Sequence, residues 1–230
     1  MKITKNRKLM LNNFDTSKIY EPLDAIKILK EKSYVNFKET IDISINLGID
    51  SNKTDQNIKG VVNLPNGTGK TVKVAVIANE DKQNDAINNG ADLVGSDDLI
   101  ETISKSKIEF DVLIATPDMM PKLGKVAKIL GPKGLMPNPK LGSVTNDLAK
   151  AVSDAKSGQV EIRNDKDGNI GVSIGKKSFD DEKLVKNYNA IIDALEKEKA
   201  NNTLKGDLVK QAFVTSSMGV SYKVKLGKSI

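Results

Sequence analysis

The sequence predicts a mixed fold in which both ends of the chain build one α+β domain and the middle forms an α/β domain inserted into it. Two rhythms of apolar residues support this prediction. In the outer thirds, strand candidates alternate apolar and polar residues, as half-buried antiparallel strands do. In the middle third, short apolar runs alternate with helical stretches, which indicates crossover units around a parallel sheet. The expected domains are residues 1–67 with 160–230, and residues 68–159.

The first third supplies one helix and two strands of the outer domain. The stretch "YEPLDAIKILKEK" places Pro22 at an early helical position and spaces Leu23, Ile26 and Leu29 or Lys30 along one face. The stretch "TIDISINLGI" then alternates apolar with polar residues, which predicts an antiparallel strand with one buried face. A second strand is expected around "KGVVNLP".

The middle third contains three strand candidates, "TVKVAVIA", "ADLVG" and "DVLIATP", separated by the helical stretches "DKQNDAINNG" and "SDDLIETISKSK". A further helix is expected over "PDMMPKLGKVAKIL". The last helix, "TNDLAKAVSDAKSG", has Thr145 or Asn146 as its N-cap and Gly158 as its C-cap. Between these two helices, "GPKGLMPNPKLG" (131–142) holds too much glycine and proline for a helix or strand, so it is a shaped loop.

The last third returns to antiparallel character. The strands "QVEIR" and "NIGVSIG" are predicted to form a hairpin around "NDKDG". The longest helical pattern follows, with Ser178 and Asp181 as its capping box. Two more strands are expected on either side of "SSMG". The chain crosses between the domains twice, near Gly67, Gly69 and Gly158, which are the candidate hinge residues.

The composition limits the chemistry that the chain can perform. It has no cysteine and no histidine, so disulfides, thiolate or imidazole catalysis and His/Cys metal sites are excluded. The N-terminus lacks an apolar core of signal-peptide length, and no apolar run approaches the ~20 residues of a membrane span. We therefore expect a cytoplasmic protein with no cofactor, no bound metal and no membrane partner.

Positive charge is concentrated in the outer domain. The formal net charge is +6, and residues 1–67 and 160–230 carry +3 each, because the 12 basic and 12 acidic residues of the middle segment cancel. Within the middle segment, residues 121–159 are basic. This distribution favours a polyanionic partner; lysines that only solvate the surface are the alternative.

Two tempting motifs have structural explanations. The stretch "GTGKT" (67–71) is similar to the end of a phosphate-binding P-loop, but position 64 is Leu where the motif needs Gly, and strand-like sequence follows the lysine. The carboxylate clusters at 97–98 and 180–182 stand where helices begin, so they are expected to cap those helices and not to bind metal. No catalytic set of residues remains, and an enzyme is the least favoured class.

Two other stretches suit a nucleic-acid interface. The stretch "NFKETIDIS" places an aromatic side chain beside polar ones, and "SSMGVS" places hydroxyls, a methionine and a glycine in a turn between strands. If strand 40–48 and the C-terminal strands share a sheet, both stretches can lie on one surface. An aromatic or methionine side chain can pack on a ribose or base, and hydroxyls can contact 2′-OH groups, as the recognition of folded RNA requires.

Five stretches, "KILGPKGLMPNPKLGSVT", "FKETIDISINLGID", "LPNGTGK", "EIRNDKDGNIGVSIGKKSF" and "SSMG", closely resemble the signature of the bacterial ribosomal protein L one family along the whole chain. The resemblance implies a split α+β domain with an inserted, three-layer Rossmann-like domain on a hinge. It also implies a monomer within the large ribosomal subunit that binds the rRNA of the mobile stalk. There it would assist release of deacylated tRNA at the exit site, and it would repress translation of its own mRNA.

The same resemblance implies the residues of the site. The RNA contacts of the family carry over to eight positions: Phe37, Glu39, Thr40, Arg163, Lys166, Ser217, Met218 and Gly219. The sequence departs from the family pattern at four positions: Asn36, Lys38, Ser217 and Val220. Lys133 and Lys140 are expected to make secondary phosphate contacts, the alternative being a purely structural loop. A two-domain hinged ligand-binding protein is the alternative function, which this architecture alone would permit.

Overall fold

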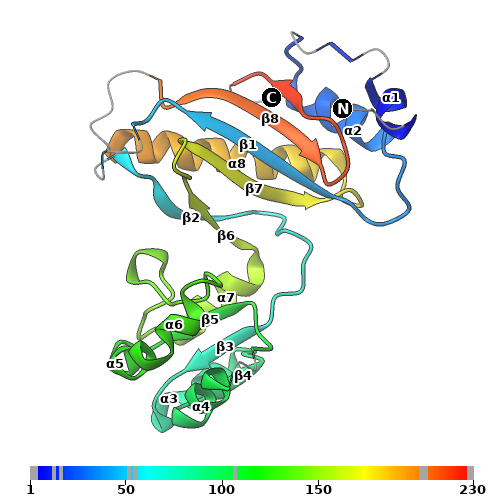
Figure 1. Cartoon of the computed structure of the whole chain (residues 1–230). Helices are drawn as coiled ribbons and strands as arrows, with labels where there is room; N and C mark the ends of the chain where they lie inside the picture. Colours follow the sequence, from blue (N-terminus) through cyan, green and yellow to red (C-terminus); the bar gives the residue numbers. More distant parts are fainter. Residues whose placement is uncertain are drawn as a thin grey trace. The chain divides into compact units, whose positions relative to one another are not determined.

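Two compact units form the chain in the computed structural model, which describes residues 5–11, 14–15, 18–50, 53, 56–105, 108–201 and 207–226 (Figure 1). Unit 1 contains Met1–Gly69 and Val160–Ile230, and unit 2 contains Lys70–Gln159. Both units combine helices with strands, so the predicted mixed fold is confirmed. The assignment of a hinged insert in a split domain stays a prediction. None of the described helices is both long and apolar enough to cross a membrane.

A four-stranded antiparallel sheet with the order β7-β1-β8-β9 forms the centre of unit 1. The elements that lie wholly or mostly in this unit are α1 (Lys5–Leu11), α2 (Pro22–Glu31), β1 (Thr40–Leu47), β2 (Lys59–Asn63), β6 (Gln159–Arg163), β7 (Asn169–Lys176), α8 (Asp181–Asn201), β8 (Val209–Ser216) and β9 (Tyr222–Val224). Because β1 pairs directly with β8, the expected sheet shared by strand 40–48 and the C-terminal strands is present.

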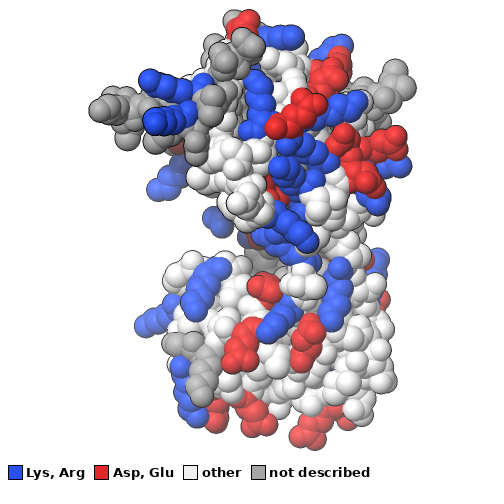
Figure 2. Space-filling view, turned by 90° about the vertical axis from the view of Figure 1, so that its right-hand side faces the viewer, with Lys and Arg blue, Asp and Glu red and all other residues white. Residues whose placement is uncertain are grey.

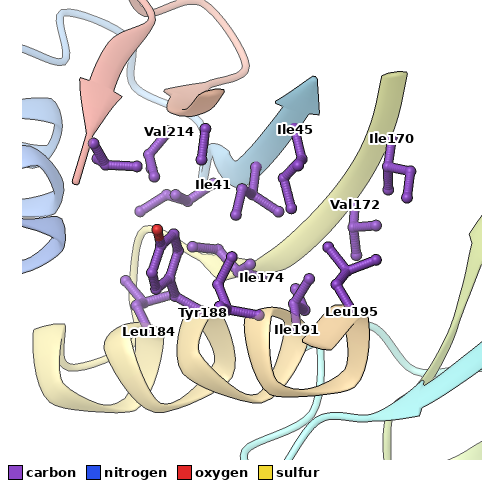
Figure 3. Close-up of a cluster of buried hydrophobic side chains, with 14 of the residues drawn as sticks. Ile41, Ile45, Ile170, Val172, Ile174, Leu184, Tyr188, Ile191, Leu195 and Val214 are labelled. Atoms are coloured by element: carbon purple, nitrogen blue, oxygen red, sulfur yellow. The ribbon is translucent and has the colours of Figure 1, made fainter. Parts of the chain in front are cut away.

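Alternation along β1 explains why one face of this sheet is buried. Ile41, Ile43 and Ile45 are at most 1% exposed, whereas Ser44 between them is exposed. The isoleucines pack against an apolar stripe on α8 made of Leu184, Tyr188, Ile191 and Leu195 (Figure 3). Helix α2 joins the same core through its own buried residues Ala25, Ile26 and Leu29.

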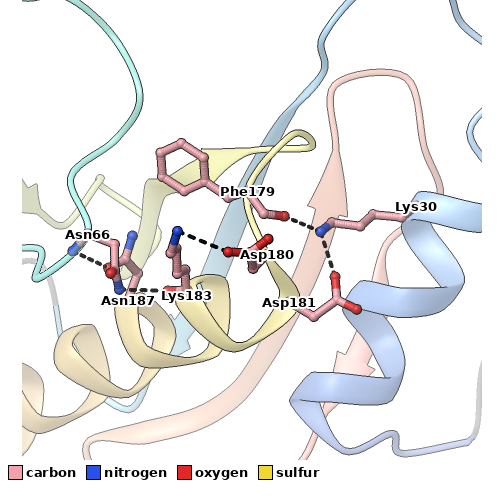
Figure 4. Close-up of polar contacts among 7 residues, drawn as sticks. All are labelled: Lys30, Asn66, Phe179, Asp180, Asp181, Lys183 and Asn187. Carbon is pink, nitrogen blue, oxygen red and sulfur yellow. Dashed lines mark hydrogen bonds and ion pairs between the residues drawn. The ribbon is translucent and has the colours of Figure 1, made fainter.

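A fully buried asparagine ties the segment before unit 2 to this core. The side-chain Nδ2 of Asn187 donates to the carbonyl oxygens of Gly67 (2.9 Å) and Ile174 (2.8 Å). Its Oδ1 accepts from the backbone N–H of Asn66 (3.1 Å), as Figure 4 shows. One side chain of α8 therefore bonds to both residue 66 and residue 67, and Asn66 Nδ2 adds a further bond to the Lys183 carbonyl of α8 (3.2 Å).

The start of α8 is held by a lysine of α2, an element from the N-terminal part of the chain. Lys30 Nζ on α2 donates to the carbonyl oxygen of Phe179 and pairs with the Asp181 carboxylate (Figure 4). The side chains of Lys30 and Asp181 are 19% and 30% exposed, so solvent screens this ion pair only in part. The contact fixes helix α2, which comes early in the chain, against a helix that comes late.

The predicted hairpin between "QVEIR" and "NIGVSIG" is wrong. Strand β7 pairs with β1, while β6 pairs with β2 in a separate two-stranded sheet. The turn itself exists, because Asp165 Oδ1 accepts from the N–H groups of Asp167 (2.9 Å) and Asn169 (2.7 Å). However, Asn164 donates its own N–H to the Ile58 carbonyl (3.2 Å) and accepts the Ile58 N–H at its Oδ1 (2.8 Å). These bonds direct the strand before the turn toward β2.

Unit 2 is built of three layers around a parallel sheet with the order β4-β3-β5. Its described elements are β3 (Val74–Ile77), α3 (Glu80–Asn88), β4 (Leu93–Gly95), α4 (Asp97–Ser104), β5 (Val112–Ala115), η2 (Pro117–Met119), α5 (Met120–Leu123), η3 (Gly124–Val126), α6 (Ala127–Leu130), η4 (Pro139–Leu141) and α7 (Leu148–Ser157). Val74 and Val76 pack with residues of α3 and α7, whereas Ala75 and Ile77 pack with α4 and residues 119–130. Helices therefore cover both faces, as the all-apolar run of β3 predicts.

Two helices in the structure differ from the helices predicted from the sequence. The helix expected over 117–130 is divided into four short helical segments, because Pro121 has no N–H to donate and Gly124 is a poor helix former. Helix α8 begins at Asp181, after a turn, so Ser178 does not occupy its capping position. Both differences concern local ends and breaks, which tertiary contacts decide.

The N-cap of α7 is Asp147 and not Thr145 or Asn146. Its Oδ1 accepts the backbone N–H of Lys150 (3.2 Å), while its own N–H donates to Thr145 Oγ1 (3.1 Å). The Asp147 carboxylate accepts a free N–H of the first helical turn, and its negative charge is favourable at the positive end of the helix dipole. It therefore caps the helix better than the side chain of Thr145 or Asn146 would. The C-cap is Gly158, as predicted, in the left-handed conformation with φ 106°.

Candidate nucleic-acid interface

The two stretches predicted to form an interface lie side by side at one end of unit 1. Antiparallel pairing places Ile41 opposite Ser216, so the residues just outside both strands also meet. Thr40 N–H donates to Ser217 Oγ (3.1 Å), and Ser217 N–H donates to the Thr40 carbonyl (3.1 Å). The predicted common surface for Thr40 and Ser217 is therefore present. We call residues 216–219 the recognition turn.

Glu39 is buried beneath the recognition turn. Its side chain is 1% exposed, and its Oε1 accepts the N–H of Met218 (3.0 Å) and the hydroxyl of Ser216 (3.2 Å). Its Oε2 is buried and has no partner among the described residues. A carboxylate in this position shapes the turn from below instead of offering an exposed oxygen, so Glu39 is a positioning residue.

Gly219 closes the turn where no other residue fits. A Cβ atom at this position would lie 2.3 Å from Ser216 Oγ and 3.3 Å from Leu29 Cδ2. The Gly219 N–H donates to the Ser216 carbonyl (3.1 Å), which completes a tight turn. The glycine thus allows Ser216 to reach Glu39, while the side chain of Met218, just before the glycine, is exposed.

Exposed apolar side chains lie in this turn and in the connection that precedes Glu39. Phe37 and Met218 are each 53% exposed, which is unusual for side chains of their size. Tyr34 is 43% exposed and belongs to the same connection between α2 and β1 as Phe37. An aromatic ring, a thioether and the neighbouring hydroxyl of Ser217 together offer stacking and hydrogen bonding to an unpaired nucleotide.

The departures from the family pattern leave the turn intact. Ser217 keeps a hydroxyl that bonds to Thr40, and Val220 packs against the core of unit 1. Asn36 and Lys38 are exposed on the connection before β1. The sequence analysis did not include Ser216, which is 6% exposed, among the site residues. Only its position directly before Ser217, Met218 and Gly219 could have indicated that it belongs to the site.

Arg163 and Lys166 do not join this cluster. Arg163 is the last residue of β6, and Lys166 lies in the turn that follows it. This turn contacts the opposite end of β1, where Leu47 N–H donates to the Gly168 carbonyl (2.9 Å). The pKa of Asp165 in this turn is lowered because its carboxylate accepts the Asn169 N–H and further hydrogen bonds. The structure thus separates the eight predicted contacts into two groups on unit 1.

The loop 131–142 of unit 2 has a structural role of its own. Its Leu135 and Met136 pack against the core, and the Asn138 N–H donates to Ser143 Oγ (2.8 Å). Lys133 is exposed, as a phosphate contact requires. The side chain of Lys140, the second predicted contact, lies outside the described residues.

The predicted hinge glycines all have positive φ angles, namely 65° at Gly67, 71° at Gly69 and 106° at Gly158. Gly67 is bonded to Asn187, and a Cβ at Gly69 would lie 2.9 Å from the Phe179 ring. The positive φ angles, and at Gly69 also the closeness of the Phe179 ring, explain why the chain needs glycine there. Hinge motion at these positions stays a prediction.

The P-loop-like stretch and the carboxylate pair 97–98 both have structural settings in the described chain. Lys70 is followed by extended chain and then β3, so the helix of a P-loop is missing after "GTGKT". Asp97 and Asp98 stand in the first turn of α4, where Asp97 also pairs with Lys122 (2.9 Å). Over the described part of the chain, no cluster of three or more acidic side chains is placed to hold a metal ion.

Comparison with known proteins identifies the family. The sequence matches the Ribosomal protein L1p/L10e family over residues 29–220. It is 59% identical over 207 residues, 90% of each chain, to the "Large ribosomal subunit protein uL1" of Pelagibacter ubique (strain HTCC1062). It is 53% identical over 208 residues, 90% of this chain and 87% of the relative, to the protein of the same name in Rickettsia peacockii (strain Rustic). Both relatives are named as ribosomal proteins and not as enzymes. The chain therefore belongs to the Ribosomal protein L1p/L10e family.

Proposed function

We propose that this chain is a cytoplasmic, non-catalytic protein of the large ribosomal subunit that binds rRNA of the mobile stalk through unit 1. Support comes from the relatives, which are named as large-subunit proteins, and from the charge, because the net +6 resides in the segments of unit 1. Figure 2 shows Lys and Arg side chains gathered in the middle of the face of unit 1, the upper body. Phosphate neutralisation by such side chains provides affinity, and the recognition turn provides selectivity.

The single observation that carries the proposal is the recognition turn beside Phe37. Met218, in the turn, and Phe37, two residues before Glu39 in the chain, are each 53% exposed, and the buried Glu39 carboxylate accepts the Met218 N–H and so ties the turn to the segment that holds Phe37. A rigid surface with stacking groups and a hydroxyl suits a folded RNA whose bases are unpaired at that point.

The finer parts of the function follow from the family. We propose that the protein acts as a monomer within the subunit, that it assists release of deacylated tRNA at the exit site, and that it represses translation of its own mRNA. Lys133 and Lys140 of unit 2 would add phosphate contacts, and Gly67, Gly69 and Gly158 would let the units move. The alternative of a hinged ligand-binding protein has no support in the relatives, which are named as ribosomal proteins.

A salt-titrated binding experiment tests the proposal. The wild type and the variant Phe37→Ala/Met218→Ala are each measured with a stalk rRNA fragment and with a scrambled hairpin of equal length. We expect the wild type to prefer the stalk fragment at moderate salt and the variant to lose this preference while keeping weak, salt-sensitive binding. Equal wild-type affinity for both RNAs would show that the basic face only attracts polyanions, and the proposal would be wrong.

A further inference from the structure

Helix α2 supports the recognition turn from two sides. Its buried Leu29 packs against the turn, because a Cβ added to Gly219 would lie 3.3 Å from Leu29 Cδ2. The connection from α2 to β1 carries Phe37 and ends at Glu39, whose carboxylate accepts the Met218 N–H (3.0 Å). The position of the last turn of α2 therefore sets the position of both the recognition turn and the segment that precedes β1.

A partly buried ammonium group fixes this last turn of α2. Lys30 follows Leu29 in the sequence, and its Nζ donates to the Phe179 carbonyl and pairs with the Asp181 carboxylate at the start of α8 (Figure 4). The Lys30 side chain is only 19% exposed, so its charge needs partners within the protein. Hydrogen bonds that involve a charged group are roughly twice as strong as neutral ones. The two contacts thus hold the end of α2 at one place on α8.

The carbonyl that Lys30 contacts is itself held in place. The ring of Phe179 packs against two glycines, since a Cβ at Gly69 would lie 2.9 Å from the ring and a Cβ at Gly175 would lie 3.0 Å from it. The Phe179 N–H donates to the Lys176 carbonyl (3.0 Å), which closes the turn between β7 and α8. An acceptor fixed by packing and by a hydrogen bond allows the lysine little freedom.

The charges around the ammonium commit it to the protein. Lys30 lies in the last turn of α2, where the helix dipole favours a positive charge. The pKa of the neighbouring Asp180 is lowered by the Lys183 side chain and, to a smaller extent, by Lys30. Lys30 therefore faces the Asp180 and Asp181 carboxylates, both of which repel an RNA phosphate. This lysine is placed to organise the protein and not to contact RNA.

We propose that Lys30 is a positioning residue for RNA recognition, because it holds the end of α2 on α8 and thereby fixes the recognition turn. The inference rests on the proposed function and adds to it a residue that touches no RNA. Neither the motifs nor the resemblance assigned Lys30 to the site. Without the ammonium, the last turn of α2 can shift, and Leu29 and Glu39 shift with it. Selectivity, which depends on the shape of the turn, should then fall, while salt-dependent attraction to phosphate should remain.

Amide hydrogen exchange, measured by NMR on the full chain, tests the positioning role without RNA. In the wild type, the Met218 N–H is bonded to the Glu39 carboxylate and the Gly219 N–H to the Ser216 carbonyl (3.1 Å). Lys30→Met keeps the apolar stem of the side chain and removes its ammonium group. We expect both amides to exchange about tenfold faster in this variant, the effect of one hydrogen bond to a charged group at the low end of its range.

A second variant and two controls accompany Lys30→Met. Asp181→Asn removes the charge of one partner only, so both amides should exchange about threefold faster. Ile162→Val removes a buried methyl group from β6, at the other end of β1, and controls for a general loss of stability. Lys186→Met removes an exposed charge from α8 and controls for net charge. Neither control should alter the exchange of the two turn amides.

Salt-titrated binding to the stalk rRNA fragment and to the scrambled hairpin measures the consequence for recognition. Lys30→Met should lower the preference for the stalk fragment about tenfold. The slope of log affinity against log salt should stay unchanged, because the ammonium neutralises no phosphate. Ile162→Val and Lys186→Met should keep both the preference and the slope.

Each outcome decides the proposal. Unchanged exchange of the two turn amides in Lys30→Met and Asp181→Asn would overturn it. A slope reduced by roughly 0.9 in Lys30→Met would show a direct phosphate contact, and the positioning role would be wrong. An equal loss of preference in Ile162→Val would show that general stability governs the turn, which also contradicts the proposal. A wild type without preference for the stalk fragment would refute the proposed function instead, and faster exchange in Lys30→Met would then still establish that this lysine holds the turn.

Discussion

Replacing Glu39 with alanine is expected to loosen the recognition turn and to destabilise unit 1. The carboxylate is 1% exposed and accepts hydrogen bonds from the Met218 N–H (3.0 Å) and the Ser216 hydroxyl (3.2 Å). A hydrogen bond to a charged group contributes about 1.5–3 kcal/mol, so the two contribute roughly 3–6 kcal/mol. Burying a carboxylate whose Oε2 has no partner among the described residues offsets part of this. We expect the free energy of unfolding to fall by about 2–4 kcal/mol.

Glutamine at this position separates the hydrogen bonds from the charge. Glu39→Gln keeps an oxygen that can accept from Met218 and Ser216, so we expect a loss of about 1 kcal/mol and an unchanged preference for the stalk fragment. Glu39→Ala should lose most of that preference, because the turn is no longer held. The exposed Glu31 at the end of α2 provides a matched control, Glu31→Ala, with the same change in charge and an expected effect within about 0.5 kcal/mol.

Tyrosine fluorescence is a suitable assay for this comparison. The chain has no tryptophan, and all four tyrosines, Tyr20, Tyr34, Tyr188 and Tyr222, belong to unit 1. Urea unfolding followed in this way reports the stability of unit 1, and RNA binding is measured in parallel. If Glu39→Gln abolishes the RNA preference as completely as Glu39→Ala, the charge itself contacts RNA and the positioning role is refuted.

Three further predictions concern the frame of each unit. Asn187→Ala should lower the free energy of unfolding by roughly 3–4 kcal/mol in the tyrosine assay, since it leaves the carbonyls of Gly67 and Ile174 without their donor; Lys186→Ala should have almost no effect. Burial raises the pKa of Tyr188 from 10.0 to about 12, so the folded state retains this proton longer and stability should fall as the pH rises from about 10 to about 12. Tyr188→Phe should remove roughly 2 kcal/mol of this alkaline loss, measured by urea unfolding across that range, and an unchanged pH profile would contradict the assignment. The Val74 N–H and then Lys156 lower the pKa of Asp92, so its stabilising contribution is present above about pH 4 and is lost on acidification. Asp92→Asn should therefore show a shallower loss of stability below about pH 4, followed by circular dichroism, and a slope equal to that of the wild type would contradict this.

The local pattern of the sequence predicted most of the helices and strands. Alternating isoleucines placed β1 in an antiparallel sheet, and the apolar runs around Val74–Ile77 and Val112–Ala115 placed two strands in a parallel sheet with both faces covered. These predictions succeeded because side-chain periodicity follows directly from backbone geometry. The sequence did not predict where α7 and α8 begin or where the segment 117–130 breaks. Neighbouring residues can each serve as the cap, so the end of a helix can shift by one or two residues.

The candidate site was predictable in its residues but not in its arrangement. The motifs identified Phe37, Glu39 and Met218, and the composition excluded cysteine and histidine chemistry. Nothing in the sequence indicated that Glu39 lies under the turn as a buried acceptor, because its neighbours Ser216 and Met218 are almost 180 residues away. Burial is a property of the packed sheet and not of the local segment.

By itself, the sequence determined the element types, the excluded chemistry and the family to which the chain belongs. Only the tertiary structure decided that β6 leaves β7 for β2, that the Glu39 carboxylate lies beneath the recognition turn, and that Lys30 of α2 reaches the start of α8. The physical reason is that strand pairing and buried hydrogen bonds join residues more than a hundred positions apart. Their energies depend on which partners the folded chain brings into contact, which no local pattern specifies.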